Sequence, residues 1–193
     1  MSTDLIKELR ELTGAGMMDI KEALTQTGSQ KEEAIAFLRK KGLTKMTKKQ
    51  DRVAKEGLVE SYIHPGSKLG VLIEVNCETD FVARTDDFKA LVKDLALHIA
   101  AANPLYISRE EVPGEVVEKE REIVRAQAEG KPLDIVDRMV EGKLEKYFEE
   151  VCLLEQKFIK DQDKTINQYI AESVAKMGEN VQVRRFSRFV LGN

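Results

Sequence analysis

The stretch LGVLIEVNCETDFVAR, residues 69–84, decides the fold of this 193-residue chain. Glu74 and Asn76 point to one side of an extended segment, and the apolar residues between and around them point to the other. These apolar residues are Leu69, Val71, Ile73, Val75 and Cys77. The alternation predicts a strand with one buried face.

The same strand is part of a predicted hairpin. Residues 57–64 form another β-rich run, and Pro65-Gly66-Ser67-Lys68 has the composition of a hairpin turn. Residues 181–191 are a third strand candidate near the C-terminus. Three strands with packed helices predict an α+β domain over residues 57–193.

Several helices are expected around these strands. An amphipathic helix follows residue 85 and ends at Asn103-Pro104, with Phe88, Leu91, Val92, Leu95 and Ile99 on its apolar face. Two helices over about 113–150, separated by Gly130-Lys131-Pro132, predict an antiparallel helical hairpin. Its seam is expected to contain Val116, Ile123 and Val124, facing Ile135, Met139, Val140 and Leu144. A final helix is predicted near residues 165–177.

Residues 1–42 predict a compact bundle of three short helices. Breaks are expected at Thr13-Gly14-Ala15-Gly16 and at Thr27-Gly28. A capping box, Ser29 to Glu32, should open the third helix, and Gly42 should end it. The apolar faces are Leu5, Leu9 and Leu12, then Ile20, Ala23 and Leu24, then Ala34, Ile35 and Leu38.

A basic run connects the bundle to the strands. It comprises Arg39, Lys40, Lys41, Lys45, Lys48, Lys49, Arg52 and Lys55. Contact with nucleic acid is one interpretation, because phosphates attract such runs. The run has no interleaved aromatic residues for base stacking, and the whole chain has 31 basic and 34 acidic residues. We therefore favour a linker or solvated helix over residues 43–56 and expect no direct nucleic-acid contact.

The composition favours a cytoplasmic protein. No apolar run approaches the about 20 residues that a membrane-spanning helix needs, so no membrane contact is expected. The start Met1-Ser2-Thr3-Asp4 shows no secretory signal. Cys77 and Cys152 lie far apart among apolar residues, which is typical of buried thiols.

Patterns typical of enzymes are weak. Gly14-Ala15-Gly16 has no Gly-Lys-Ser or Gly-Lys-Thr after it, so it does not predict a phosphate-binding loop. His64 and His98 are the only histidines, and no Cys-x-x-Cys occurs, which argues against a zinc site. A nucleophilic pair of Cys77 and His98 is conceivable, but a thiol on an apolar strand face stays protonated. We expect no enzyme activity, no cofactor and no metal.

The segment after the strand leaves two interpretations open. Thr79 or Asp80 could cap a short helical turn while Phe81 packs into the core. Alternatively, Phe81 could be an exposed aromatic beside the Asp80 carboxylate at a rigid loop tip, suited to entering a partner protein.

Two long motifs resemble the elongation factor Ts family. One is residues 74–84 with its core Thr79-Asp80-Phe81-Val82, and the other is residues 9–19 with Lys21, Ala23 and Leu24. Val140-Glu141-Gly142-Lys143 and the C-terminal segment around Val183-Arg184-Arg185-Phe186 are also similar to the family. The resemblance covers nearly the whole chain.

The resemblance implies an N-terminal three-helix module of ubiquitin-associated type. It also implies a core with a three-stranded antiparallel sheet and a projecting helical hairpin. The implied function is exchange of guanine nucleotide on the translation GTPase elongation factor Tu. Asp80 and Phe81, with Thr79 and Val82, would then act beside the partner's magnesium ion. Leu12, Met17, Met18 and His98 are further partner-contact candidates, although Met17 or Met18 could equally be core and His98 could be a packed residue.

The chain departs from longer family members in carrying one copy of the core instead of two. Short members resemble this arrangement and pair through their sheets, so a homodimer with a two-fold interface is expected. Two other functions stay open. One is a ribosome- or RNA-associated module that uses the basic run, and the other is an adaptor that binds partners without changing nucleotide release.

Overall fold

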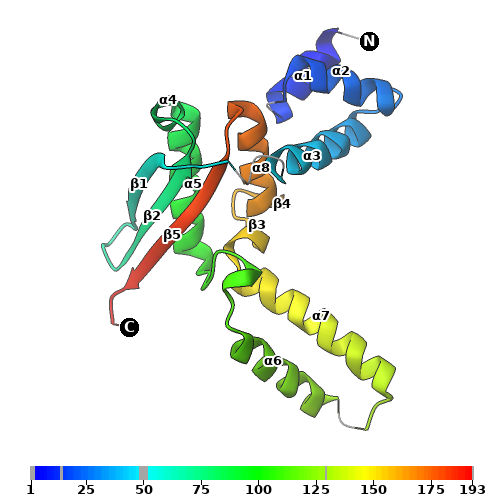
Figure 1. Cartoon of the computed structure of the whole chain (residues 1–193), viewed down its shortest axis with the longest axis vertical. Coiled ribbons are helices and arrows are strands. Elements are labelled where there is room, and N and C mark those ends of the chain that lie inside the picture. The colour runs from blue at the N-terminus through cyan, green and yellow to red at the C-terminus, as the bar shows by residue number, and fades with distance from the viewer. Residues whose placement is uncertain (1–2, 14, 48–51, 129, 193) are drawn as a thin grey trace. The chain divides into compact units, whose positions relative to one another are not determined.

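The computed structural model describes residues 3–13, 15–47, 52–128 and 130–192 (Figure 1). Residue contacts divide the chain into two units, residues 1–100 with 167–193 and residues 101–166, and each is described by itself. The predicted fold class is confirmed, since N-terminal helices are followed by a three-stranded antiparallel sheet and further helices.

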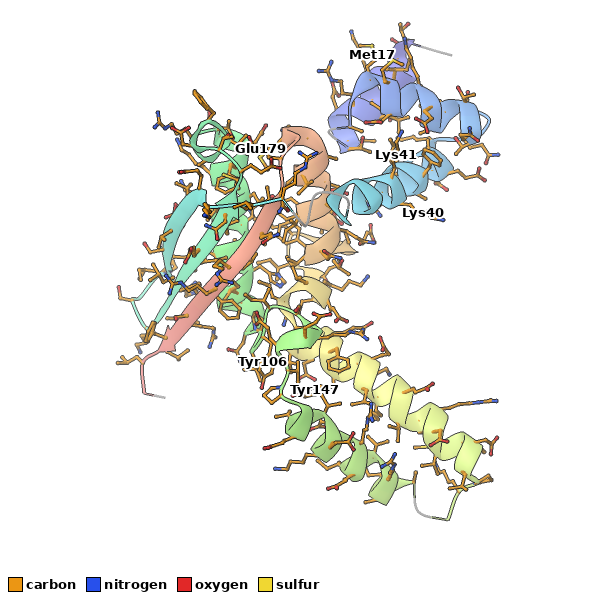
Figure 2. The ribbon with its side chains drawn as sticks, viewed as in Figure 1. Met17, Lys40, Lys41, Tyr106, Tyr147 and Glu179 are labelled. Carbon is orange, nitrogen blue, oxygen red and sulfur yellow. The ribbon has the colours of Figure 1, made fainter. Side chains whose placement is uncertain are left out.

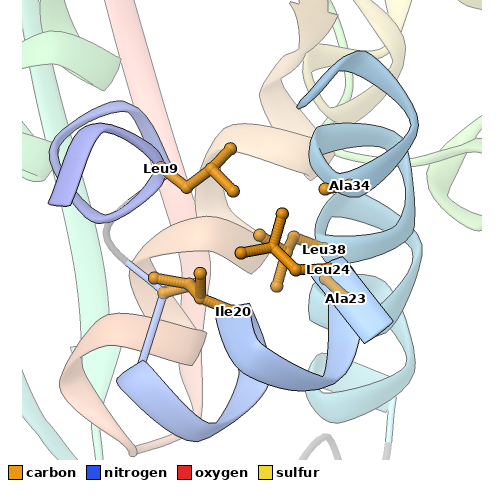
Figure 3. Packing of buried hydrophobic residues seen from close by; sticks show 7 residues of the cluster. Leu9, Ile20, Ala23, Leu24, Ala34 and Leu38 are labelled. Carbon is orange, nitrogen blue, oxygen red and sulfur yellow. The ribbon is translucent and has the colours of Figure 1, made fainter. Parts of the chain in front are cut away.

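The three N-terminal helices are α1 (Thr3–Thr13), α2 (Met17–Gln26) and α3 (Lys31–Thr47). Each contributes to one small apolar core, because residues spaced three or four apart lie on the same helical face. The buried side chains shown in Figure 3 are Leu9, Ile20, Ala23, Leu24, Ala34 and Leu38. The two alanines leave room for the backbones of α2 and α3 to approach closely.

Two predictions about these helices are wrong. Ser29 has a φ of 69° and its amide donates to Leu24 O at 2.8 Å, so it closes α2 and does not open α3. Gly42 does not end α3, which continues to Thr47. A glycine ends a helix where it adopts positive φ, and Gly42 is not among the glycines that do so. Gly14, Lys48 and Lys49 lie outside the described residues.

Part of the basic run is neutralised within the bundle. Lys41 Nζ lies 3.0 Å from Asp19 Oδ1 and also contacts Glu22, and Figure 2 labels this lysine beside Lys40. Hydrogen bonding to Glu22 raises the pKa of Lys41 above its usual value. At Lys41, therefore, the positive charge is paired with carboxylates of α2.

The sheet contains β1 (Glu56–Ile63), β2 (Leu69–Cys77) and β5 (Val181–Val190) in the order β1-β2-β5, all antiparallel. The predicted hairpin and third strand are confirmed. The register shifts between Glu74 and Val75 where β2 pairs with β5, which marks a bulge. Gly57 has a φ of 144°, and a Cβ there would lie 2.1 Å from Val75 O, so only glycine fits.

One face of this sheet is covered by α5 (Asp86–Ala102), and α8 (Ile166–Met177) packs nearby (Figure 1). Tyr169 on α8 donates a hydrogen bond to Asp94 on α5 at 2.9 Å. The predicted apolar faces are buried, except that Leu69 at the start of β2 is only half-buried. The buried residues are Val71, Ile73, Val75 and Cys77 on β2 and Phe88, Leu91, Val92, Leu95 and Ile99 on α5.

The second unit contains the predicted helical hairpin, α6 (Gly114–Gln127) and α7 (Leu133–Val151). Its seam includes the predicted Val124, Met139, Val140 and Leu144, with Val117, Val136 and Phe148 packed beside them. The predicted Val116 packs instead in the cluster of Val112, Val151 and Cys152. Ile123 and Ile135 do not belong to the seam, because they are 41% and 43% exposed. Their sequence neighbours Val124 and Val136 face the other helix of the hairpin instead.

Polar and aromatic contacts fix the base of the hairpin. Arg109 lies 4.7 Å above the Phe148 ring and donates to Glu145 at 2.7 and 2.5 Å, while its other bonds go to Glu155. Tyr106 and Tyr147, labelled in Figure 2, pack with the buried Cys152. Short 3-10 helices occur at Arg109–Glu111 (η1) and Leu153–Glu155 (η2). A small ladder of β3 (Lys157–Phe158) and β4 (Asp161–Thr165) was not predicted.

Candidate functional site

The predicted site segment forms a separate short helix, α4 (Asp80–Ala83), directly after β2. Phe81 on this helix is 79% exposed, whereas Ala83 is buried and Val82 is half-buried. The interpretation that places Phe81 in the core is therefore wrong. An aromatic ring with this exposure contributes little to folding, which leaves its apolar surface available for a partner.

Thr79 is the N-cap of α4. Its backbone is extended, with φ −129° and ψ 154°, and its Oγ1 accepts a hydrogen bond from the Val82 amide at 3.4 Å. Capping by Thr79 or Asp80 was predicted, and the structure selects Thr79. Asp80 is instead the first helical residue, and its carboxylate lies 2.7 Å from Arg84 Nη2 in an exposed pair.

Two further side chains form hydrogen bonds with Thr79. The Cys77 thiol donates to Thr79 O at 3.2 Å, and the Glu179 carboxylate accepts the Thr79 hydroxyl proton at 2.6 Å. Glu179, labelled in Figure 2, follows α8 and is 100 residues away in sequence. Sequence reasoning missed it, because no local pattern links two segments this far apart. In the structure, the strand pairing of Cys77 with Val181 brings these two segments together.

The nucleophilic pair of Cys77 and His98 finds no support. Cys77 is fully buried, and desolvation raises its pKa to about 11, so the thiol is protonated at neutral pH. His98 is also fully buried. Its burial favours the packed interpretation and leaves no surface for direct contact with a partner in this structure.

The remaining candidates lie on the N-terminal helices. Leu12, Met17 and Met18 are 57%, 50% and 77% exposed. The prediction that Leu12 packs on the same buried face as Leu9 is therefore wrong, and neither methionine is core. Together they provide flexible apolar side chains at the surface of α1 and α2.

The outer face of the sheet is a second exposed apolar surface. It presents Val59, Ile63, Leu72 and Phe189, which are 64%, 60%, 48% and 69% exposed. The strand register places Ile63 opposite Gly70 and Gly70 opposite Phe189. The side chains of Ile63 and Phe189 therefore flank a residue that has no side chain. A hollow of about 560 Å³ is lined there by Ser61, Gly70, Leu72 and Phe189 among others. We call Val59, Ile63, Leu72 and Phe189 the outer sheet patch.

Among the side chains that the structure describes, no group of three or more His, Cys, Asp or Glu residues is placed to hold a metal ion. Among the helices of the described part of the chain, none is long and apolar enough to cross a membrane.

Comparison with known proteins gives one consistent family. The family model described as Elongation factor TS matches residues 2–193. The Elongation factor Ts of Heliobacterium modesticaldum is 64% identical over 190 residues, which cover 97% of this chain and 88% of that protein. The Elongation factor Ts of Carboxydothermus hydrogenoformans is 58% identical over 194 residues, covering 100% and 89%. The namesake from Geobacter sulfurreducens is 57% identical over 189 residues, covering 97% and 88%. These matches confirm the resemblance seen in the sequence motifs, and the chain belongs to the elongation factor Ts family.

Proposed function

We propose that this protein is a guanine nucleotide exchange factor for elongation factor Tu in translation elongation. It binds the GDP-bound GTPase, disturbs the magnesium and phosphate site, and promotes GDP release so that GTP can bind. Membership of the elongation factor Ts family supports the class of function. The observation that carries the mechanism is the exposed Phe81 on a capped and hydrogen-bonded turn.

The physical basis of the exchange is linkage. A GTPase of this kind holds GDP through backbone amides of its phosphate loop and through Mg²⁺, which neutralises phosphate charge. A factor that binds the nucleotide-free form most tightly weakens GDP binding by the same ratio by which GDP weakens binding of the factor. No covalent bond changes, so the mechanism requires no catalytic acid or base and no cofactor.

Phe81 acts as the wedge in this proposal. Its ring is already exposed and needs no rearrangement before it enters the partner beside the metal site. Asp80 gives up its exposed pairing with Arg84 and perturbs the magnesium shell. An exposed pair of this kind contributes only about 0.3–0.5 kcal/mol, so the exchange of partners costs little. Thr79 and Val82 complete the contact segment.

Docking is assigned to a second set of residues. Leu12, Met17 and Met18 on α1 and α2 contact the nucleotide domain of elongation factor Tu through their exposed apolar side chains. Because His98 is buried in α5, it supports the site through packing and does not touch the partner. No nucleic acid and no membrane takes part, and the protein acts in the cytoplasm, where translation takes place.

We also propose that the protein is a homodimer that pairs through the outer sheet patch. An antiparallel sheet that faces water normally carries polar side chains on that face. Here four large apolar side chains are exposed on it. A two-fold interface would bring the same patch from both copies together and remove it from water.

Release of a fluorescent GDP analogue from elongation factor Tu, measured by stopped flow, tests the proposal. The native chain should accelerate release strongly, and Phe81→Ala should lose most of this effect while staying folded. Leu133→Ala is the matched control, because Leu133 is 81% exposed but lies on α7. Equal acceleration by native protein and Phe81→Ala would refute the wedge. No acceleration by the native chain would refute exchange and favour an adaptor, and binding that falls steeply with salt would favour the RNA-associated alternative.

A further inference from the structure

The start of α4, the helix that carries Phe81, is bound by a carboxylate from a distant segment. Glu179 Oε2 accepts the Glu78 amide at 3.1 Å and the Thr79 amide at 3.0 Å, and Glu179 Oε1 accepts the Thr79 hydroxyl at 2.6 Å. Hydrogen bonds to an ionised acceptor are about twice as strong as neutral ones. Both oxygens of this side chain therefore bind the two residues that directly precede α4.

The contact is reciprocal. Glu78 Oε1 accepts the backbone amide of Asn180 at 2.6 Å, so each segment binds the other's backbone through a glutamate. Asn180 is fully buried and its Nδ2 donates to Arg52 O at 2.9 Å. Gly178, with a φ of 82°, ends α8 and turns the chain so that Glu179 and Asn180 come directly before β5. We call residues 78–79 and 179–180 the glutamate clamp.

The helix α4 needs such support because it is short. Four residues make too few internal hydrogen bonds to overcome the cost of starting a helix. The capping bond from Val82 to Thr79 is long at 3.4 Å, and the exposed Phe81 ring adds no core contact. The strongest contacts that fix the start of α4 are therefore those that Glu179 makes with Thr79.

We propose that Glu179 is a positioning residue for Phe81 in nucleotide exchange. Its hydrogen bonds fix Thr79 to the segment between α8 and β5. The position of Phe81 on α4 is therefore held while the ring enters the partner. This inference rests on the proposed exchange function. It assigns no contact with the partner to Glu179, which acts only through the loop.

Glu179→Gln is the decisive substitution. The amide keeps the size of the side chain but replaces one acceptor oxygen with a donor, which cannot bind the amide protons or the hydroxyl proton in the same way. We expect the maximal GDP release rate, at saturating concentration of the variant, to fall about tenfold, as loss of one charge-assisted hydrogen bond predicts. The concentration for half-maximal effect should change little, because Leu12, Met17 and Met18 are untouched. Glu118→Gln, an equal charge change on α6, is the control that should keep the native rate.

A double-mutant cycle separates positioning from a general structural role. If Glu179 acts through Phe81, then Glu179→Gln should cause no further loss of rate in a Phe81→Ala background. Additive losses in the double variant would overturn the proposal. Glu179→Asp keeps the charge but withdraws it by one methylene, and its maximal rate should lie between those of the native protein and Glu179→Gln.

Hydrogen exchange tests the clamp without any partner. In Glu179→Gln, the amides of Glu78 and Thr79 should exchange faster, while core amides of β2 such as that of Ile73 keep their protection. Unchanged protection at Glu78 and Thr79 would overturn the clamp, and so would a native maximal release rate in Glu179→Gln. Should Glu179→Gln fail to fold, Glu179→Asp gives the same comparisons. If even the native chain does not accelerate release, the proposed function itself fails and this inference falls with it.

Discussion

Both faces of the three-stranded sheet carry large apolar side chains, but only on one face are these side chains covered. On the inner face Val71, Ile73 and Val75 are at most 2% exposed under the helices. On the outer face Leu72 is 48% exposed and Phe189 is 69% exposed. The apolar side chains of the inner face are thus buried within one chain, whereas those of the outer face are left exposed by the chain itself.

This difference separates stability from association. Burying apolar surface contributes about 25 cal/mol per Å², so the inner face contributes to folding of the single chain. The outer sheet patch can contribute only when a second surface covers it. Substitutions on the two faces should therefore give different results in unfolding and in association measurements, and the predictions below test this from the largest expected effect to the smallest.

The largest effect is expected for Ile73→Ala on the inner face. Ile73 is 1% exposed, and its truncation removes buried methyl groups and leaves a cavity. Such substitutions cost about 2–5 kcal/mol in free energy of unfolding. Urea denaturation followed by circular dichroism measures the change, and Val59→Ala on the exposed outer face is the control. An equal loss for both variants, measured at the lowest protein concentration, would contradict the difference between the faces.

Leu72→Asp on the outer face should instead weaken dimerisation. In a two-fold interface the substitution introduces two like charges into an apolar contact, and we expect the dissociation constant to rise about 100-fold or more. Analytical ultracentrifugation over a concentration series measures this. Leu133→Asp adds the same charge on α7 and should leave the dimer intact. A native chain that is monomeric at every concentration would rule out the dimer.

The contrast between the faces also explains what the sequence could predict. Apolar side chains at every second position over residues 69–77 were enough to predict β2 with its observed bounds, because a strand with one buried face repeats every two residues. The same logic predicted the apolar face of α5. The small ladder of β3 and β4 was missed because β4, Asp161–Thr165, is almost entirely polar.

Helix ends and distant polar contacts were harder to predict. Gly42 continues α3, whereas Gly178 ends α8 with positive φ, and residue type alone does not distinguish the two. In the site, Thr79 was predictable as a cap because threonine accepts from the free amides at a helix start. Glu179 was not, since its contact with Thr79 depends on how β2 and β5 pair, and sequence patterns carry no information on such pairing.

A smaller effect should come from pH through Cys77, the last residue of the inner face. Burial raises its pKa to about 11, above the ordinary value of 9.0, so the folded state keeps a proton that the unfolded state loses. The contribution of Cys77 to stability is therefore constant well below pH 9 and is lost between about pH 9 and pH 11, by about 1 kcal/mol between pH 9 and pH 10. Cys77→Ala should remove this part of the pH dependence in urea titrations. Cys152, whose pKa is also raised to about 11, lies in the other unit and supplies a comparable term.

The smallest effect concerns an ion pair on the outer face, formed by Arg185 and Glu74. Arg185 Nε donates to Glu74 Oε2 at 2.6 Å, and this hydrogen bond holds the pKa of Glu74 below its usual value. A lowered carboxyl pKa stabilises the folded state above the unfolded pKa, and the contribution is lost as the pH falls through the folded value. In Arg185→Ala, the pKa of Glu74 measured by NMR titration should rise toward normal, with little change in stability because the pair is exposed. If the shift grows at protein concentrations where the native chain dimerises, the pair lies inside the interface. A shift that is independent of concentration would place it at the rim, where water still reaches it.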